Sequence, residues 1–175
     1  MKMRIILGVL ASAAVLPSSA MAAGLPKFHS KLIVPGKSVG GVSLGEGAAK
    51  AIKTWGGNTD CTAGPTLTEC MWGSDANGTT GSISLSFASG KVTHIDIQLN
   101  ANTHGAAVFK GVLMSLKTKS GIGLKSDVAQ LEKAYSGKVG ANGVGYTLGS
   151  GAHTTTFATS AGKFVSVDIG TPRNV

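Results

Sequence analysis

One serine lies in a pattern that could support nucleophilic catalysis. Ser43 sits within Gly41-Val42-Ser43-Leu44-Gly45, which matches the Gly-x-Ser-x-Gly turn that raises a serine hydroxyl above the sheet of an α/β-hydrolase. Asp96 and His104 follow in the order that a Ser-Asp-His triad would use. Because the expected strands are not separated by crossover helices, a packing turn explains the glycines more simply. A small exported serine hydrolase using Ser43 is therefore kept as an alternative hypothesis.

The cysteines and histidines do not form a metal-binding pattern. Cys61 and Cys70 are the two cysteines of the chain, and two thiols are too few ligands for structural zinc. In an exported protein they predict a disulfide, whose short loop would stabilise the fold by about 2–3 kcal/mol. The four histidines are scattered without metal-ligand spacing: His29, His94, His104 and His153. We expect a disulfide, no metal site and no cofactor.

A polar stripe is predicted on one face of a strand near the middle of the chain. Residues 91–99 alternate strictly, so that Ile95, Ile97 and Leu99 would face a core while His94, Asp96 and Gln98 would face outward. Asp168 occupies the matching position later in the chain. These four polar residues are a candidate binding face for a partner protein, and a merely solvated face is the simpler alternative.

The lysines suggest a second candidate surface. Lys110, Lys117, Lys119 and Lys125 form the closest grouping of basic residues, although they do not make a dense block. Such a patch would suit an anionic glycan or an anionic surface. Aromatic residues make up only 5% of the chain and do not alternate with basic ones, which argues against a nucleic-acid platform.

The elements that would position these residues come from an internal repeat. Gly41-Val42-Ser43-Leu44, followed by an apolar stripe to Trp55, reappears as Gly121-Ile122-Gly123-Leu124, followed by a stripe to Tyr135. Residues 87–97 likewise match residues 157–169. Each copy of a repeat is one supersecondary unit. Because Gly123 stands where the first copy has Ser43, the repeat also favours a structural role for Ser43.

Each copy is expected to be one helix followed by about three antiparallel strands. Helical spacing predicts helices over residues 46–55 and from Ser126, as N-cap, to about Tyr135. Trp55 and Trp72 occupy helix-stripe and strand positions, which favour a core role over exposed binding anchors. Strands are expected at these ranges: 70–72, 83–87, 91–99, 144–148, 153–159 and 163–169.

The expected fold class is α+β, with two tandem helix-plus-antiparallel-sheet repeats that form a shared or continuous sheet with the helices on one face. One helix on one small sheet cannot bury enough apolar surface alone, so the two units should join. The expected organisation is a signal peptide over residues 1–22, a first repeat with the disulfide loop over 23–99, a connection over 100–119 and a second repeat over 120–175.

The N-terminus predicts export. Lys2 and Arg4 precede a short apolar run, and Ala20-Met21-Ala22 supplies the small residues of a signal-peptidase site. Cleavage after Ala22 would leave a chain with fourteen basic and eight acidic residues, a formal charge of +6. No cysteine follows the cleavage site to carry a lipid. We expect a periplasmic or secreted protein of bacterial type without a membrane anchor.

The repeat resembles a known family at the level of the fold. A Gly-Val-x-Leu-Gly turn, a helix ending at Trp-Gly or Tyr-x-Gly and strands closing on Gly-Lys-Val-x-x-Ile resemble the β-lactamase-inhibitor-protein-like (BLIP-like) tandem α/β repeat and domains of the BamE/SmpA type. The resemblance covers residues 39–99 and 120–169. It implies a concave antiparallel sheet backed by helices that grips another protein. The inhibitor family has a disulfide in each copy, whereas this chain has one.

Together these patterns predict an exported, non-enzymatic protein-binding module, in an inhibitor-like role or another. The alternatives from other classes are the serine hydrolase that uses Ser43 and an envelope protein that binds anionic glycan or lipid through its lysines.

Overall fold

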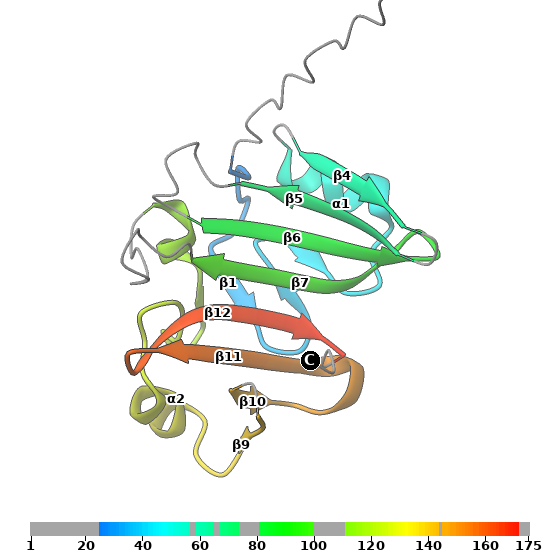
Figure 1. Cartoon of the computed structure of the whole chain (residues 1–175). Helices are drawn as coiled ribbons and strands as arrows, with labels where there is room; N and C mark the ends of the chain where they lie inside the picture. The colour runs from blue at the N-terminus through cyan, green and yellow to red at the C-terminus, as the bar shows by residue number, and fades with distance from the viewer. Residues whose placement is uncertain are drawn as a thin grey trace, which may run out of the picture.

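A computed structural model describes residues 25–56, 59–64, 67–73, 81–99, 111–143 and 145–171. The fold is α+β: over these residues it contains two α-helices, an eight-stranded antiparallel sheet and a four-stranded mixed sheet (Figure 1). The expected signal peptide over residues 1–22 lies outside the described residues. No helix in the described part of the chain is long and apolar enough to cross a membrane.

The eight-stranded sheet joins the two halves of the chain and is called the main sheet below. Its strands, in spatial order, are β4 (Asp60–Ala63), β5 (Thr68–Trp72), β6 (Gly81–Ala88), β7 (Lys91–Leu99), β12 (Lys163–Gly170), β11 (Thr154–Ser160), β10 (Tyr146–Leu148) and β9 (Val139–Ala141). Each half contributes four strands in mirrored order, and the halves meet where β7 pairs with β12. The outermost strands, β4 and β9, were not expected from the sequence.

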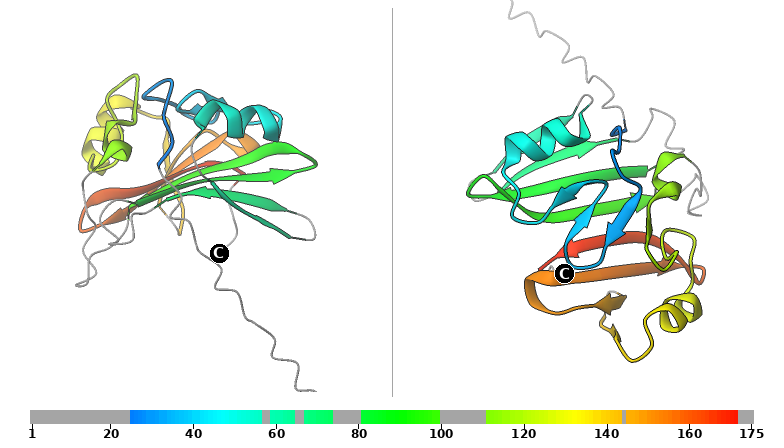
Figure 2. Two further views of the ribbon diagram at one scale, coloured as in Figure 1. Left: turned by 90° about the horizontal axis from the view of Figure 1, so that it is seen from above. Right: turned by 180° about the vertical axis from the view of Figure 1, so that it is seen from behind.

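The two repeats share the main sheet, as one form of the expectation had it, but the strands do not make a single continuous sheet, because four short strands form a second sheet. This sheet has the order β3 (Val42–Ser43), β2 (Ser38–Val39), β1 (Leu32–Val34) and β8 (Lys117–Thr118). Strand β1 pairs antiparallel with β2 and parallel with β8, which comes from the second half of the chain. These strands precede the helices in sequence and lie with them in the layer over the main sheet (Figure 2), so they pair with one another instead of extending it.

Both helices lie on one face of the main sheet, as expected (Figure 2). Helix α1 (Ala48–Trp55) buries Ala51 and Trp55 and is followed by Gly56 as C-cap, whose φ of 57° suits glycine. Helix α2 (Val128–Ala134) buries Leu131 and begins at Asp127 as N-cap, rather than at Ser126 as expected. Short 3₁₀ helices are formed by Val112–Ser115 and Gly151–His153.

The core lies between this layer and the main sheet. Trp55 and Trp72 are both fully buried, and their rings meet edge to face with centroids 5.1 Å apart. Both are therefore core residues, as the sequence favoured. In the second half, Phe157 and Phe164 are also fully buried, with centroids 5.0 Å apart.

The two halves repeat the same local construction. Strands β6 and β7 are joined by Ser89 and Gly90, with φ of 49° and 71°, and strands β11 and β12 are joined by Ala161 and Gly162, with φ of 49° and 75°. Positive φ at both central residues is the hallmark of a two-residue type I′ hairpin. The sequence match of residues 87–97 with 157–169 aligns Phe87 with Phe157 and needs a two-residue gap. Because the two turns have the same length, this gap does not exist and the alignment is wrong at Phe87. Leu85 occupies the position equivalent to Phe157, because they pair with Ile95 and Val167.

A β-bulge follows each of these hairpin turns. Phe87 pairs with Val92 and Ser86 with His94, so that Thr93 is the extra residue; Val165 is the extra residue in the second half. Strict alternation over the expected strand 163–169 would turn Val165, Val167 and Ile169 toward the core. The bulge instead turns Phe164 inward and leaves Val165 only partly buried.

Candidate functional site

The four residues of the predicted polar stripe lie on the face of the main sheet that points away from the helices, called the outer face below. Pairing of β7 with β12 sets Asp96 opposite Asp168, Gln98 opposite Ser166 and His94 opposite Gly170. The structure therefore brings all four predicted residues together at the junction of the two halves. The sequence could match Asp96 to Asp168 but gave no sign that they are cross-strand partners.

Their orientation follows from strand alternation. Ile95 and Ile97 have no exposed surface and face the helices, so the residues between and beside them face outward. Gln98 is exposed, while His94, Asp96 and Asp168 are partly buried. Cross-strand partners lie about 5 Å apart at Cβ, which places two carboxylates close together at the centre of the sheet.

Strands β5, β6 and β11 extend this polar surface on either side. Ser84 pairs with Asp96 on one side, and Thr156 pairs with Asp168 on the other. Ser84 is buried beside its larger neighbours, and its hydroxyl donates a hydrogen bond of 2.9 Å to Glu69 Oε1.

His94 is fixed in place at the edge of this group. Its Nε2 lies 2.6 Å from the carbonyl oxygen of Thr171, which can only accept, so Nε2 carries the proton. Gly170 lies directly beneath the imidazole, because a Cβ added there would be 2.7 Å from His94 Cδ2 and 2.5 Å from the carbonyl oxygen of Thr93. The histidine ring thus fills the space that any other residue at position 170 would need.

The charged side chains of the outer face, away from the hairpin ends, are carboxylates among the described residues: Asp60, Glu69, Asp96 and Asp168. By contrast, exposed lysines lie on the helices, Lys50 and Lys53 on α1 and Lys133 on α2. A chain with a formal charge of +8 therefore carries an acidic sheet face opposite a basic helical layer.

Ser43 does not lie with the other residues of the hypothetical triad. It belongs to β3 in the helix-side layer, whereas Asp96 lies on the outer face of the main sheet (Figure 2). His104 lies outside the described residues. The backbone N–H of Ser43 donates to Glu46 Oε2 at 3.0 Å, and the N–H of Gly123 donates to Ser126 Oγ at 3.2 Å in the second half. The matched bonds give the Gly-x-Ser-x-Gly pattern a structural explanation.

Two of the predicted lysines line a shallow pocket of about 380 Å³. Lys117 reaches it from β8 and Lys125 from the turn before α2, and Lys163 at the start of β12 completes it. Lys119 is exposed outside the lining, and Lys110 lies outside the described residues. Sequence reasoning missed Lys163, because only the fold brings the hairpin end to the helix.

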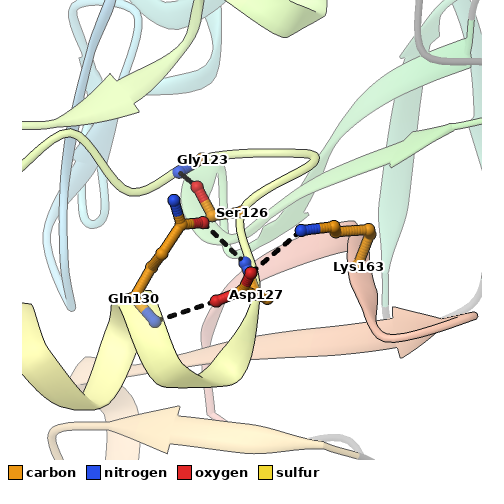
Figure 3. A network of polar contacts seen from close by, with 5 residues as sticks. All are labelled: Gly123, Ser126, Asp127, Gln130 and Lys163. Atoms are coloured by element: carbon orange, nitrogen blue, oxygen red, sulfur yellow. Dashed lines mark hydrogen bonds and ion pairs between the residues drawn. The ribbon is translucent and has the colours of Figure 1, made fainter.

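The rim of this pocket is a network of polar contacts (Figure 3). Asp127 Oδ1 accepts from the backbone N–H of Gln130 at 2.9 Å, and Gln130 Oε1 accepts from the N–H of Asp127 at 3.0 Å, which forms a capping box. Asp127 Oδ2 also accepts from Lys163 Nζ at 2.9 Å. The hydrogen bond from Lys163, followed by that from Gln130, lowers the pKa of the Asp127 carboxyl.

The predicted disulfide is present. Cys61 and Cys70 are cross-strand partners in β4 and β5, and their sulfur atoms are bonded at 2.01 Å. The bond is consistent with an oxidising location outside the cytoplasm. Beside it, Cys70 and the exposed Leu67 help to line an open pocket of about 300 Å³ between α1 and the β4–β5 hairpin, whereas the exposed Met71 pairs with Ser84 and lies on the outer face.

Among the described residues, no group of three or more His, Cys, Asp and Glu side chains could hold a metal ion. Comparison with known proteins adds no identification: no family model, no curated protein and no solved structure matches this chain.

Proposed function

We propose that this chain is an exported, non-enzymatic protein that binds another protein through the outer face of its main sheet. The observation that carries the proposal is the division of the molecule into two layers of different charge. One layer holds the helices and their exposed lysines, and the other presents Asp96 and Asp168 at the centre of a polar sheet face. The partner that fits this face is a protein with a basic surface.

The size of the face supports a protein partner. Strands β6 and β12 are each eight residues long. The five central strands β5, β6, β7, β12 and β11 are five to nine residues long. With strands about 4.8 Å apart and a rise of about 3.3 Å per residue, they present roughly 600 Å². A specific interface buries about 800 Å² on each partner, so this face would supply most of one.

The resemblance to the BLIP-like repeat points in the same direction, because that plan uses a helix-backed antiparallel sheet to grip a protein. Inhibition of a partner enzyme is one form that the binding could take. Export is supported by the signal-like N-terminus together with the disulfide.

The proposal is tested with a partner captured from the exported proteins of the host and then purified. Its Kd is measured for the wild type, for the double variant D96N/D168N and for the control E132Q, which removes an exposed carboxylate from α2 on the opposite layer. We expect the double variant to weaken binding about tenfold or more and the control to leave it unchanged. Thermal melts of all three proteins ensure that only folded variants are compared.

The salt dependence of binding and the comparison of the three affinities test whether the outer face is the binding site. Binding through the acidic face should weaken as salt increases, because the interacting charges are screened. A captured partner whose affinity is equal for the wild type, D96N/D168N and E132Q would contradict the assignment of the outer face.

A further inference from the structure

The pocket lined by Lys117, Lys125 and Lys163 is positively charged, and the proposed binding through the outer face gives it no role. Its lining also includes Ser126 and Gln130 and contains no Asp or Glu. Asp127 stands at the rim, where Lys163 already balances its charge through the 2.9 Å ion pair. Lys117 and Lys125 are both exposed, and no carboxylate of the described residues forms an ion pair with either. The pocket therefore has an excess of two positive charges.

The first half of the chain provides an internal comparison, since it has the same backbone construction, with Lys91 at the place of Lys163 but no lysine at the places of Lys117 and Lys125. The N–H of Gly45 donates to the carbonyl of Val92 at 2.8 Å, and the N–H of Lys125 donates to that of Phe164 at 2.9 Å. Gly45 and Lys125 are thus equivalent, and their φ values of 77° and 72° agree. A side chain rarely adopts this conformation, so a lysine there is not what the turn itself requires.

Two other lining residues, Lys117 and Ser126, also make the second half more positive. Lys117 bridges to Gly123 in the way that Ser38 pairs with Ser43, so a lysine replaces a serine. The backbone carbonyl of Ser126 accepts from the N–H of Phe164, and the backbone carbonyl of Glu46 accepts from the N–H of Val92. The two positions are therefore equivalent, and a neutral residue replaces an acid. Gln130 changes in the opposite direction, because the matching helix bonds from Leu131 to Asp127 and from Ala51 to Gly47 make Lys50 its equivalent. The lining therefore carries two more positive charges than the equivalent residues of the first half, or one more when Asp127, which replaces Gly47, is counted. Architecture alone does not account for the difference.

We infer that this pocket binds a phosphate group carried on a small polar molecule such as a sugar phosphate. Lysine ammonium groups are point charges that suit a phosphate approached from several directions. The Ser126 hydroxyl and the Gln130 amide lie at the same pocket and can hydrogen-bond the rest of the ligand. The volume of about 380 Å³ exceeds the needs of a phosphate ion alone and lies within the range of small-molecule sites.

The test titrates the purified, disulfide-bonded protein with glucose 6-phosphate, inorganic phosphate and glucose, and follows amide chemical shifts. We expect saturable shifts at Lys125, Ser126 and Gln130 with glucose 6-phosphate, weaker binding of inorganic phosphate and none of glucose. Absence of saturable binding of glucose 6-phosphate in the millimolar range would overturn the site. Equal affinities for the two phosphates would overturn the inference that the pocket contacts a carrier.

Two matched double variants separate the pocket from overall charge. K117Q/K125Q should weaken the Kd for glucose 6-phosphate about tenfold or more, while K50Q/K53Q, which removes the same charge from α1, should leave it unchanged. Equal weakening by both pairs would mean nonspecific attraction and would contradict the proposal. Lys125→Gly keeps the backbone of the equivalent Gly45, so it should weaken binding without lowering the Tm.

The outer face takes no part in these measurements. D96N/D168N should bind glucose 6-phosphate like the wild type, so the failure of either proposal leaves the other standing.

Discussion

The substitution Lys125→Gly tests whether the turns at Gly45 and Lys125 are structurally equivalent in the two halves. Lys125 has φ of 72° at the position where the first half has Gly45, with φ of 77°. Holding a non-glycine residue in this left-handed conformation costs about 1–2 kcal/mol. Glycine removes that cost but adds about 0.5–1 kcal/mol of chain entropy in the unfolded state. We therefore expect Lys125→Gly to change the free energy of unfolding by between about 0 and +1.5 kcal/mol.

The assay is urea unfolding of the oxidised protein at neutral pH, with the m-value used to check that the unfolded state is unchanged. A gain of 1 kcal/mol corresponds to a rise of about 2–4 °C in Tm for a domain of this size. A loss of more than about 1 kcal/mol would refute the reasoning, because it would mean that the lysine side chain supports the fold.

The reciprocal change provides the control. A Cβ added at Gly45 would meet nothing within 4 Å, so Gly45→Ala involves no steric clash and measures the conformational cost alone. We expect it to destabilise the protein by about 1 kcal/mol. Stabilities that move in the same direction for Lys125→Gly and Gly45→Ala would contradict the equivalence of the two turns.

Three further predictions concern stability. Gly170→Ala should lower the free energy of unfolding by about 1–3 kcal/mol in urea titrations, since its Cβ would lie 2.5 Å from the carbonyl oxygen of Thr93; an unchanged midpoint would refute the close packing. Replacing both cysteines with serine should cost about 2–3 kcal/mol, and adding reductant should then have no further effect on the Tm. The lowered pKa of Asp127 should make wild-type stability depend on acid, because a depressed carboxyl pKa stabilises the fold above its unfolded value of about 4 and loses that contribution as the pH falls through the folded value. Asp127→Asn retains an N-cap residue but loses the Lys163 ion pair, so the stability gap between wild type and variant should be largest at neutral pH and should close in acid; a gap independent of pH would contradict the pairing.

Much of the fold could be predicted because its long elements carry periodic signals. Strand β7 was expected at its observed bounds, and α1 ends at Trp55 as the glycines after it indicate. Alternation in β7 also assigned its inward and outward residues correctly. These features depend on local sequence, which is why a single sequence was enough to find them.

The missed features depend on contacts between distant segments. Strands β2, β3 and β8 have two residues each, too few for any periodicity, and they exist because they pair with β1 or with one another. The N-cap of α2 was placed one residue early, because Ser126 and Asp127 are both good capping residues and only the capping box selects Asp127.

In the candidate sites, too, local sequence predicted some features, whereas others depend on contacts between distant segments. The outward positions of His94 and Asp96 followed from alternation, but the pairing of Asp96 with Asp168 required the register between β7 and β12. Similarly, Lys117 and Lys125 were grouped by nearness in sequence. Lys163 joins them only because the second hairpin folds back on the turn before α2.

The most direct test of the proposed function places a photo-crosslinking amino acid at either of two exposed positions. One is Gln98, on the outer face of the main sheet, and the other is Lys133, on α2 in the opposite layer. Illumination in the presence of the purified partner should yield a crosslinked product from position 98 and none from position 133. A crosslink from position 133 without one from position 98 would contradict binding through the outer face.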